Sequence, residues 1–509
     1  MKKYITTFII LCSSINIKAQ EIGLDQRIDE AFQPISDTVS KYVFYPIGDY
    51  PFVIYLLVGS ALFFTIYFWF PNIRHFWTAI NVVRGKYDNL EKSDSNSKDG
   101  EVSHFQALAT AVSGTVGNGN IAGVALAIAL GGPGATFWMI VCGLLGMSTK
   151  FVECTLGVHF RDVDEDGVVY GGPMYYISRG LKSKGFKTLG TIAASLFAIF
   201  CVGGSFGGGN AAQSNQATIV IKNLFGYEST FAGAMIGLIL ATLVGIIIIG
   251  GIKRIASVTE KVVPFMALIY IIACVYILAI NYSFIDDAIG LIISEAFNPT
   301  AVGVGGIIGV LMVGFQRAAF SNEAGAGSAS IAHSAVKTKY AASEGLVALL
   351  EPFIDTVVIC TMTALVIITF NSTGAFIYGG DGTGGVLIDG VVYEGAGITQ
   401  MAFAEYIPGS DIFLTVAVVL FAVSTMISWS YYGLQSWKFL FGRGYLADLT
   451  YKVLFLMFVV IGAAASMNSI WAFSDAMIFA MVFPNMIGLY FLFPIVKEQL
   501  KKYLEAIKN

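Results

Sequence analysis

Residues 111–123 read AVSGTVGNGNIAG and lie within an apolar stretch of membrane-spanning length. Gly114 and the run 117–120, which is Gly-Asn-Gly-Asn, favour an interrupted helix. Non-helical backbone survives at membrane depth only where it is buried in protein or lines a watery cavity, because each unpaired amide or carbonyl in hydrocarbon costs several kcal/mol. The segment therefore predicts a binding site for a polar solute or an ion.

The composition agrees with a membrane location. Of the 509 residues, 56% are hydrophobic and 13% are charged, and the mean hydropathy is +0.72. Because soluble proteins carry about a quarter charged residues, we expect an integral polytopic membrane protein. The net charge of −4 and the dispersed basic residues exclude nucleic-acid binding. The six isolated cysteines and four scattered histidines predict neither a metal centre nor a disulfide framework.

The first 50 residues predict two segments ahead of the membrane domain. Residues 1–19 combine a basic start, a short apolar core and the small residue Ala19, which is typical of a signal peptide. An uncleaved amphipathic extension is the alternative. Residues 20–50 have apolar side chains at helical spacing and predict an amphipathic surface helix bent near Pro34.

Eleven apolar runs are long enough to cross a bilayer, which takes about 20 residues each. They make up a membrane domain at 51–495, followed by a polar tail at 496–509. A leading span at 51–70 precedes ten core spans, at 104–130, 133–160, 188–210, 229–251, 262–281, 300–320, 344–370, 411–435, 451–468 and 472–495. An odd number of spans places the two termini on opposite sides.

The basic residues predict the orientation. With the N-terminus outside, the inner segments hold 22 lysines and arginines and the outer segments hold 3. Because basic loops remain on the cytoplasmic side, this ratio predicts an outer N-terminus and a cytoplasmic C-terminus. In the outer loop 371–410, Asp389-Gly390 between β-branched residues predicts a short hairpin, either a lid or a plain connection.

Core span 6 is predicted to be the second interrupted helix. It holds a glycine cluster at 302–309, and the segment FSNEAGAGSAS follows at 320–330. We place the unwound stretch at 305–309, because Ser321, Asn322 and Glu323 lie nearer the inner surface by residue count. Core spans 1 and 6 correspond in two five-span halves, which is the pattern of inverted repeats with a midplane site.

Two further core spans carry polar side chains suited to binding. Core span 3 ends with Asn210, Gln213 and Asn215, and Gln213 is the preferred solute contact, with helix capping as the alternative. In core span 8, the adjacent hydroxyls of Ser424 and Thr425 can complete a Na⁺ shell begun by carbonyls, or bond back to their own helix.

Charged residues within spans predict pairs. Lys150 and Glu153 are spaced to pair on one helix face. Glu351 and Asp355 lie one turn apart and repel, so a cation, Arg317 or a shared proton is expected nearby. Asp355 is a candidate for proton or ion coupling, with a structural ion pair as the alternative.

Several long motifs in a fixed order resemble the alanine or glycine:cation symporter family, whose members have the leucine-transporter fold. The resemblance covers nearly the whole chain after residue 24. Its most specific elements are TVGNGNIAGVALAIALGGPGATFW (115–138), GMSTKFVE (146–153), YGGPMYYI (170–177), FSNEAGAGS (320–328), EPFIDT (351–356) and FAVSTMISW (421–429).

The resemblance implies an all-α fold of eleven transmembrane helices, with a 5+5 inverted repeat, one extra N-terminal helix and broken core helices 1 and 6. It implies sodium-coupled import of small neutral amino acids across a bacterial inner membrane, with Na⁺ as coupling ion and no organic cofactor. The implied substrate-binding residues are Thr115, Gly117, Gly119, Asn120, Gln213, Ile307 and Trp429. The implied sodium-binding residues are Ser113, Val116, Phe421, Ser424 and Thr425.

One position differs from the family pattern, and several alternative functions remain open. The family often has Arg-Gly where this chain has Arg317-Ala318. A larger substrate such as glutamine, proton coupling through Asp355, and a channel or nutrient receptor on the same scaffold are the rival interpretations. An enzyme is not expected, since the spans hold no Ser/His/Asp set or HExxH motif, and no obligatory protein partner is predicted besides the lipid bilayer.

Overall fold

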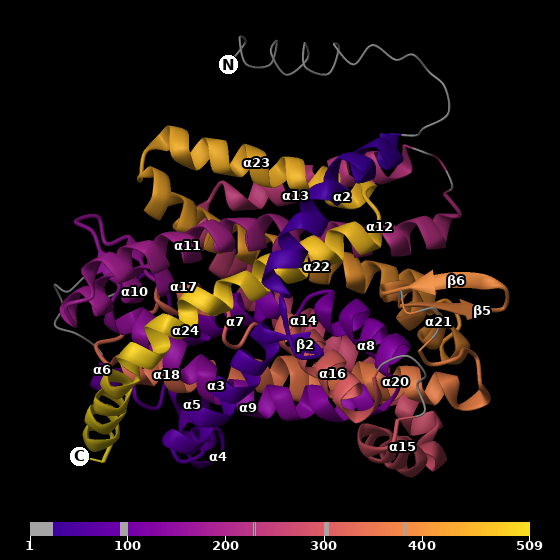
Figure 1. Cartoon of the computed structure of the whole chain (residues 1–509), viewed down its shortest axis with the longest axis horizontal. Coiled ribbons are helices and arrows are strands. Elements are labelled where there is room, and N and C mark those ends of the chain that lie inside the picture. The colour runs from indigo at the N-terminus through magenta and orange to yellow at the C-terminus, as the bar shows by residue number, and fades with distance from the viewer. Residues whose placement is uncertain are drawn as a thin grey trace, which may run out of the picture.

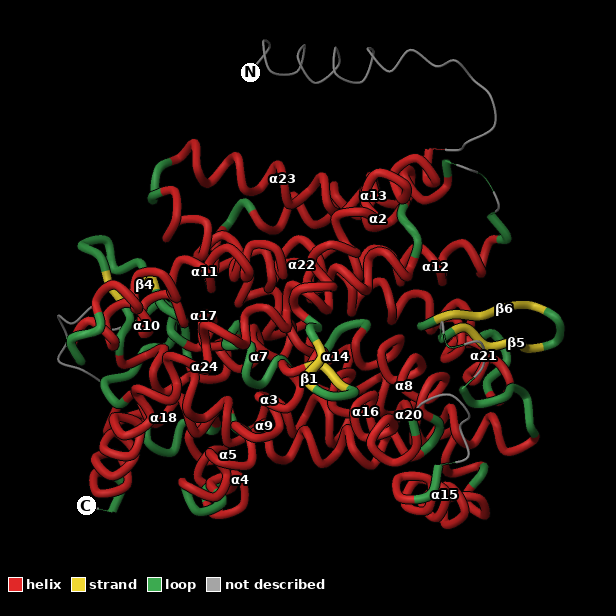
Figure 2. The backbone as a smooth tube through the Cα atoms, viewed as in Figure 1, coloured by secondary structure: helices red, strands yellow, loops and turns green. Residues whose placement is uncertain are grey.

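The computed structural model describes residues 24–91, 100–227, 229, 231–299, 305–379, 382 and 384–508. Most of these residues are helical (Figure 2). The predicted signal peptide, 1–19, lies outside the described residues. The helix predicted after it is present as α2 (Leu24–Val43), which contains Pro34 and packs Phe32 against Phe473 with ring centroids 5.0 Å apart.

The described elements follow in chain order. The first half contains β1 (Pro46–Ile47), β2 (Tyr50–Pro51), α3 (Phe52–Tyr67), α4 (Pro71–Arg74), α5 (Phe76–Val83), α6 (Asp88–Glu91), α7 (His104–Thr115), η1 (Gly119–Gly123), α8 (Val124–Gly131), α9 (Gly134–His159), β3 (Asp162–Val163), β4 (Val169–Tyr170), α10 (Pro173–Ser183), α11 (Lys187–Phe206), η2 (Gly207–Ala211), α12 (Ala212–Phe225), α13 (Ala232–Ile248) and α14 (Gly251–Ile280). The second half contains η3 (Tyr282–Phe284), α15 (Ile285–Phe297), α16 (Gly306–Asn322), α17 (Ala329–His333), α18 (Ala341–Ala348), α19 (Leu350–Pro352), η4 (Phe353–Cys360), α20 (Thr361–Phe370), η5 (Asn371–Thr373), β5 (Gly385–Ile388), β6 (Val391–Glu394), α21 (Ala396–Tyr406), α22 (Ser410–Phe441), α23 (Tyr445–Ala464) and α24 (Met467–Ala506).

The helices are long and apolar enough for a membrane protein. Among the described residues, seven helices meet the length and hydropathy of a membrane span, or eight if the bent pair of α7 with η1 and α8 counts as one. Two shorter apolar helices, α3 and α13, have 16 and 17 residues. The predicted total of eleven spans is reached if the bent pair, α3, α13 and the 17-residue helix α16 are each counted as a span.

Core span 1 bends at the predicted place. The helix α7 begins at a capping box, in which Ser103 and Gln106 exchange backbone and side-chain hydrogen bonds, and it ends at Thr115. The next helical piece, Gly119–Gly131, runs at 51° to it.

The predicted break at 305–309 is wrong. Gly305 has a φ of +80° and precedes α16, whose 17 residues begin at Gly306 and end at Asn322. The backbone leaves the helix after Asn322, where Glu323 (φ 55°), Gly325 (φ 94°) and Gly327 (φ 87°) have left-handed conformations. Such conformations end a helix, whereas glycines within a helix only weaken it by about 1 kcal/mol each. Counting residues from the span ends misplaced the break.

Three wide helical turns of the π type lie at η1, η2 and η4. Such turns are frequent at functional sites because they redirect backbone and side chains. Asn120 of η1 donates a hydrogen bond to Asp355 of η4, at 2.6 Å. The wide turns η1 and η4 therefore meet in the interior.

The predicted hairpin is confirmed as the antiparallel pair β5–β6, in which Ile388 lies opposite Val391. Asp389 and Gly390 form its turn with positive φ angles of 50° and 81°. Figure 1 shows this hairpin at one end of the molecule, with the C-terminus, α6 and α18 at the opposite end.

Candidate functional site

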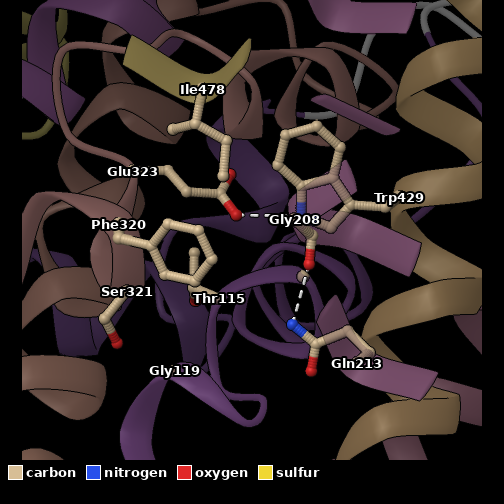
Figure 3. A pocket seen from close by; sticks show the side chains of 10 residues that line it. Thr115, Gly119, Gly208, Gln213, Phe320, Ser321, Glu323, Trp429 and Ile478 are labelled. Atoms are coloured by element: carbon tan, nitrogen blue, oxygen red, sulfur yellow. Dashed lines mark hydrogen bonds between the residues drawn. The ribbon is translucent and has the colours of Figure 1, made fainter. Parts of the chain in front are cut away.

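A small cavity lies where the break after α7 faces α16, η2 and α22 (Figure 3). About 230 Å³ of space not filled by atoms lies between its walls, and this volume includes open solvent. Its lining residues are Gly114, Thr115, Gly119, Gly208, Gln213, Phe320, Ser321, Glu323, Trp429 and Ile478. Thr115, Gly119, Gln213 and Trp429 were predicted from the sequence to bind substrate, and the structure brings these four together.

The side chains of Asn120 and Gln213 satisfy two backbone amides of the interrupted segment, those of Gly117 and Asn118. Asn120 Oδ1 accepts a hydrogen bond from the Gly117 amide at 2.8 Å, and the Asn118 amide donates to Gln213 Oε1 at 2.9 Å. Asn118 Nδ2 also donates to the carbonyl of Gln213, at 3.1 Å. Because an unpaired buried amide is costly, these bonds hold the break in one shape.

Asn120 and Gly117 do not line the cavity. The amide of Asn120 donates to the carboxylate of Asp355 at 2.6 Å and to its backbone carbonyl at 3.1 Å. A Cβ on Gly117 would lie 2.3 Å from Thr425 Oγ1 and 3.0 Å from Gln213 Oε1. Both residues therefore shape the break, since Gly117 lets α22 and α12 approach the backbone.

Gln213 links two of the irregular segments. Its Nε2 donates to the carbonyl of Gly208 at 2.9 Å, while its Oε1 holds the Asn118 amide. Figure 3 shows its side chain reaching from α12 toward the cavity, with the bond to Gly208 drawn.

Glu323 is the acidic residue among the cavity-lining residues that the sequence interpretation did not assign to the site. Its exposed fraction is 2%, and its Oε1 accepts a hydrogen bond from the indole nitrogen of Trp429 at 2.9 Å. The hydroxyl of Ser328 donates to Oε2. The signal was available as a single acidic residue in the glycine-rich run 320–328, but residue counting placed it near the inner surface.

A second predicted cluster lies beside the cavity. Thr425 Oγ1 donates to the carbonyl of Ser113 at 3.0 Å, and Ser113 Oγ donates to the carbonyl of Ser424 at 2.8 Å. Ser424 Oγ donates to the carbonyl of Phe421 at 2.9 Å. Val116, where α7 ends, is also buried. Hydrogen bonds therefore connect four of the five predicted sodium ligands in a row.

Ile307 does not belong to this site. It lies in the first turn of α16, and its exposed fraction is 45%. The residues of α16 that reach the cavity are Phe320 and Ser321, near the other end of the helix. The prediction failed because it followed from the misplaced break in core span 6.

A cation lies beside Glu351 as predicted, but it is Lys150, whereas Arg317 and Glu153 have other partners. Lys150 Nζ lies 3.0 Å from Glu351 Oε1, while Glu153 accepts a hydrogen bond from Asn485 at 2.7 Å. Arg317 pairs with Asp475 of α24. The pair Lys150–Glu153 on one helix face is therefore not formed, because partners on neighbouring helices lie closer.

Among the described residues, the hydrogen-bond donors to the carboxylate of Asp355 are all neutral. Besides Asn120, the hydroxyls of Ser321 and Thr356 donate to its Oδ2, at 2.9 and 2.7 Å. The carboxyl group is completely buried. It therefore joins the backbone break at Asn120 to the end of α16 at Ser321.

The long apolar helices, the bent segment and the buried polar cavity together define a membrane transport protein. A family model described as the sodium:alanine symporter family matches residues 30–509. The chain belongs to that family, whose members are transporters and not enzymes.

Two relatives are similar in sequence over most of their length, and a solved structure shares the fold. The sodium/alanine symporter AgcS of Methanococcus maripaludis is 38% identical over 479 residues, covering 94% of this chain and 98% of the relative. The probable sodium/glutamine symporter GlnT of Bacillus subtilis is 32% identical, covering 90% and 88%. The crystal structure of MhsT in complex with L-phenylalanine matches with a TM-score of 0.50 at 13% identity, covering 79% of this chain and 99% of that one. This likeness shows a leucine-transporter fold.

Proposed function

We propose that this protein is a sodium-coupled symporter that imports small neutral amino acids, alanine or glycine first, by alternating access. The observation that carries the proposal is the single cavity that joins the break after α7, the amide of Gln213 and the carboxylate of Glu323. This set offers partners of opposite charge to the two ends of a zwitterion.

The substrate carboxylate is assigned to the break. Gly119 lines the cavity at the start of the second helical piece, Gly119–Gly131. The positive end of the helix dipole favours an anion at a helix N-terminus. The substrate ammonium is assigned to Glu323, because a charged hydrogen bond compensates a buried carboxylate.

The coupling Na⁺ is assigned to the cluster of Ser113, Phe421, Ser424 and Thr425, with Val116 as the fifth ligand that the resemblance implies. Carbonyl and hydroxyl oxygens are the ligands that hard cations prefer. The hydroxyls now donate to the carbonyls of Ser113 and Phe421. A hydroxyl hydrogen can rotate away, so that both oxygens then face a cation.

The finer architecture and topology are part of the proposal. The bend after Thr115 falls in core span 1, and the helix end at Asn322 lies just beyond core span 6. This pair of interruptions supports a 5+5 inverted repeat with one extra N-terminal helix and eleven spans. The ratio of 22 inner to 3 outer basic residues supports an outer N-terminus and a cytoplasmic C-terminus in a bacterial inner membrane.

One ion is energetically enough. A Na⁺ entering down about 100 mV provides ~2.3 kcal/mol, and a tenfold sodium gradient adds ~1.4 kcal/mol. The sum supports roughly 500-fold accumulation of a neutral solute at 1:1 stoichiometry.

Two variants of the function have specific support. Asp355 is a buried carboxylate whose donors, in the part of the chain that the structure describes, are neutral, so it is the candidate for proton coupling or for a further cation. A relative named as a glutamine symporter supports a larger neutral substrate.

The deciding experiment is competition of labelled alanine uptake by a panel of amino acids, with and without Na⁺. We expect sodium-dependent, saturable uptake in proteoliposomes that glycine and alanine inhibit best. Uptake that persists without sodium but collapses with the pH gradient indicates proton coupling. Flux without saturation indicates a channel, and tight binding without net transport indicates a receptor.

Replacing Asn120 by alanine should abolish uptake while the protein remains folded in the membrane. The change removes the acceptor of the Gly117 amide and one donor to Asp355, and each lost buried hydrogen bond costs about 1–3 kcal/mol. Asn281→Ala is the matched control, because the hydrogen bond that its side-chain amide makes within the described residues is to its own helix end at Ile277. Wild-type uptake in Asn120→Ala, measured with equal amounts of protein, would contradict the assigned break.

A further inference from the structure

The segment that carries Glu323 is held from α24 by a buried amide side chain. Asn485 Nδ2 donates to the carbonyl of Gly325 at 2.8 Å and to Glu153 Oε1, on α9, at 2.7 Å. Asn485 Oδ1 accepts a hydrogen bond from the hydroxyl of Tyr176, on α10. Asn485, Glu153 and Tyr176 are completely buried. One side chain therefore joins three helices to the segment after α16.

Residues 323–326 form a tight turn. The amide of Ala326 donates to the carbonyl of Glu323 at 3.1 Å, and Gly325, the third residue of the turn, has a φ of +94°. Glycine adopts a positive φ at this position without strain. Because Gly325 lies outside the helices α16 and α17, Asn485 supplies the donor that its buried carbonyl requires.

The turn also packs closely against two neighbouring helices. A Cβ on Gly325 would lie 2.3 Å from Leu57 of α3 and 2.9 Å from Met486 of α24. These contacts limit how closely the turn approaches both helices, but they are not directional. The hydrogen bond from Asn485 is directional, so it fixes the orientation of the peptide group that follows Gly325.

The turn sets the direction of the Glu323 carboxylate. Glu323 begins the turn, and Ser328, whose hydroxyl donates to Glu323 Oε2, follows it. The other oxygen, Oε1, accepts from the indole nitrogen of Trp429 on α22, as drawn in Figure 3. The two donors to the carboxylate therefore come from opposite sides of the turn. A turn that shifts moves Ser328 relative to Trp429 and redirects the carboxylate.

We propose that Asn485 is a positioning residue for substrate recognition, which fixes the turn so that the carboxylate of Glu323 meets the ammonium group of the amino acid. The inference rests on the proposed function, which assigns that ammonium to Glu323. Asn485 is not among the cavity-lining residues and acts through Gly325. The position requires two donors and one acceptor, which an amide supplies and a carboxylate or hydroxyl does not.

The test separates the bond to Gly325 from the bond between the helices. In Asn485→Asp the new carboxylate still accepts from Tyr176, but it cannot donate and it faces Glu153. The double variant Asn485→Asp with Glu153→Gln removes this repulsion. Its glutamine amide donates to the new carboxylate, so the link between α9 and α24 forms again with its direction reversed. The carbonyl of Gly325 still lacks its donor.

The measurement is the initial rate of labelled L-alanine uptake in proteoliposomes, over ranges of alanine and sodium concentration and with equal amounts of full-length protein. If the competition experiment selects another amino acid, that amino acid is the probe. We expect the double variant to raise the apparent KM for alanine by about 10- to 100-fold, because a small misplacement of a recognition group is costly. Its maximal rate and its sodium dependence should stay close to those of the wild type, since added substrate compensates for weaker binding.

Glu153→Gln alone is the matched control. Glu153 Oε2 has no hydrogen-bond partner among the described residues, so an amide group in its place breaks no bond. The remaining oxygen can still accept from Asn485, which keeps its donor to Gly325. The control should therefore have the KM of the wild type for alanine.

Three results would overturn the positioning role and leave the symporter proposal intact. A double variant with the KM of the wild type would show that the bond to Gly325 is dispensable. Equal increases of KM in the double variant and in Glu153→Gln would assign the effect to the contact between α9 and α24. Loss of both Asn485 variants from the membrane, with Glu153→Gln present, would make the amide a folding element. Absence of saturable uptake by the wild type for every amino acid tested refutes the proposed function itself.

Discussion

Glu323→Gln should abolish sodium-dependent amino-acid uptake, although the glutamine has nearly the same shape. The glutamine carbonyl can still accept the hydrogen bond from Trp429, and the Ser328 hydroxyl can turn to accept from the new amide group. Only the negative charge is lost. Because a close buried charge pair contributes several kcal/mol when one partner is removed, we expect the apparent affinity to fall by about 100-fold or more.

Glu323→Asp separates the effect of charge from that of position. Aspartate tolerates the left-handed backbone conformation at this residue, where φ is 55°, and it keeps the carboxylate. We therefore expect Glu323→Asp to retain more uptake than Glu323→Gln, with both measured as initial rates over a range of alanine concentrations. Equal losses in the two variants would indicate that Glu323 only supports the loop, and normal uptake in Glu323→Gln would remove the ammonium assignment.

Sequence reasoning located the first break and its neighbours because their chemistry is local. The run 117–120 has too many glycines and asparagines for a helix, and the structure bends the chain there by 51°. Ser424 and Thr425 were assigned through a motif. In the structure the Thr425 hydroxyl donates to the carbonyl of Ser113, and the Ser113 hydroxyl donates to the carbonyl of Ser424. At these positions the residue types themselves indicate the conformation or contact that the structure has.

The predicted interruption of core span 6 was wrong because two neighbouring glycine-rich segments could each have formed it. Glycine permits a non-helical backbone but does not require one. Residues 306–309 are helical, and residues 323–328 are not. Only the packing decides, because a Cβ at Gly325 would lie 2.3 Å from Leu57 and one at Gly327 would lie 2.8 Å from Pro173. The assignment of Ile307 and the omission of Glu323 both follow from that one choice.

The partners of the buried charges could not be predicted from the spacing of residues along the chain. Lys150 and Glu153 have the spacing of a helical ion pair, yet the partner of Lys150 is Glu351, which is remote in the sequence. Glu344 and the histidines were not recognised as a group, because their contacts join α7, α17 and α18. Contacts between distant segments depend on the tertiary fold and leave no periodic signal in the chain.

Ser424→Ala should lower the apparent sodium affinity of transport by roughly 10- to 100-fold, which corresponds to the loss of one charge-assisted oxygen contact. The hydroxyl of Ser424 bonds to the carbonyl of Phe421, three residues earlier, and Ser424 also lies against Ser113 of the broken helix. Ser430 in the same helix has the same kind of bond, to Ile427 at 2.6 Å. Ser430→Ala therefore removes an equivalent helix bond outside the proposed cation shell.

The two serines distinguish a sodium ligand from a helix bond. If Ser424 only bonds its own helix, Ser424→Ala and Ser430→Ala should change transport equally and leave the sodium dependence unaltered. If Ser424 holds the ion, uptake by Ser424→Ala should recover at high sodium, because added ion compensates for weaker binding. Alanine uptake measured over a range of sodium concentrations, with ionic strength held constant, separates the two results. Recovery in Ser424→Ala, with unchanged sodium dependence in Ser430→Ala, would place the driving ion beside the break at Ser113.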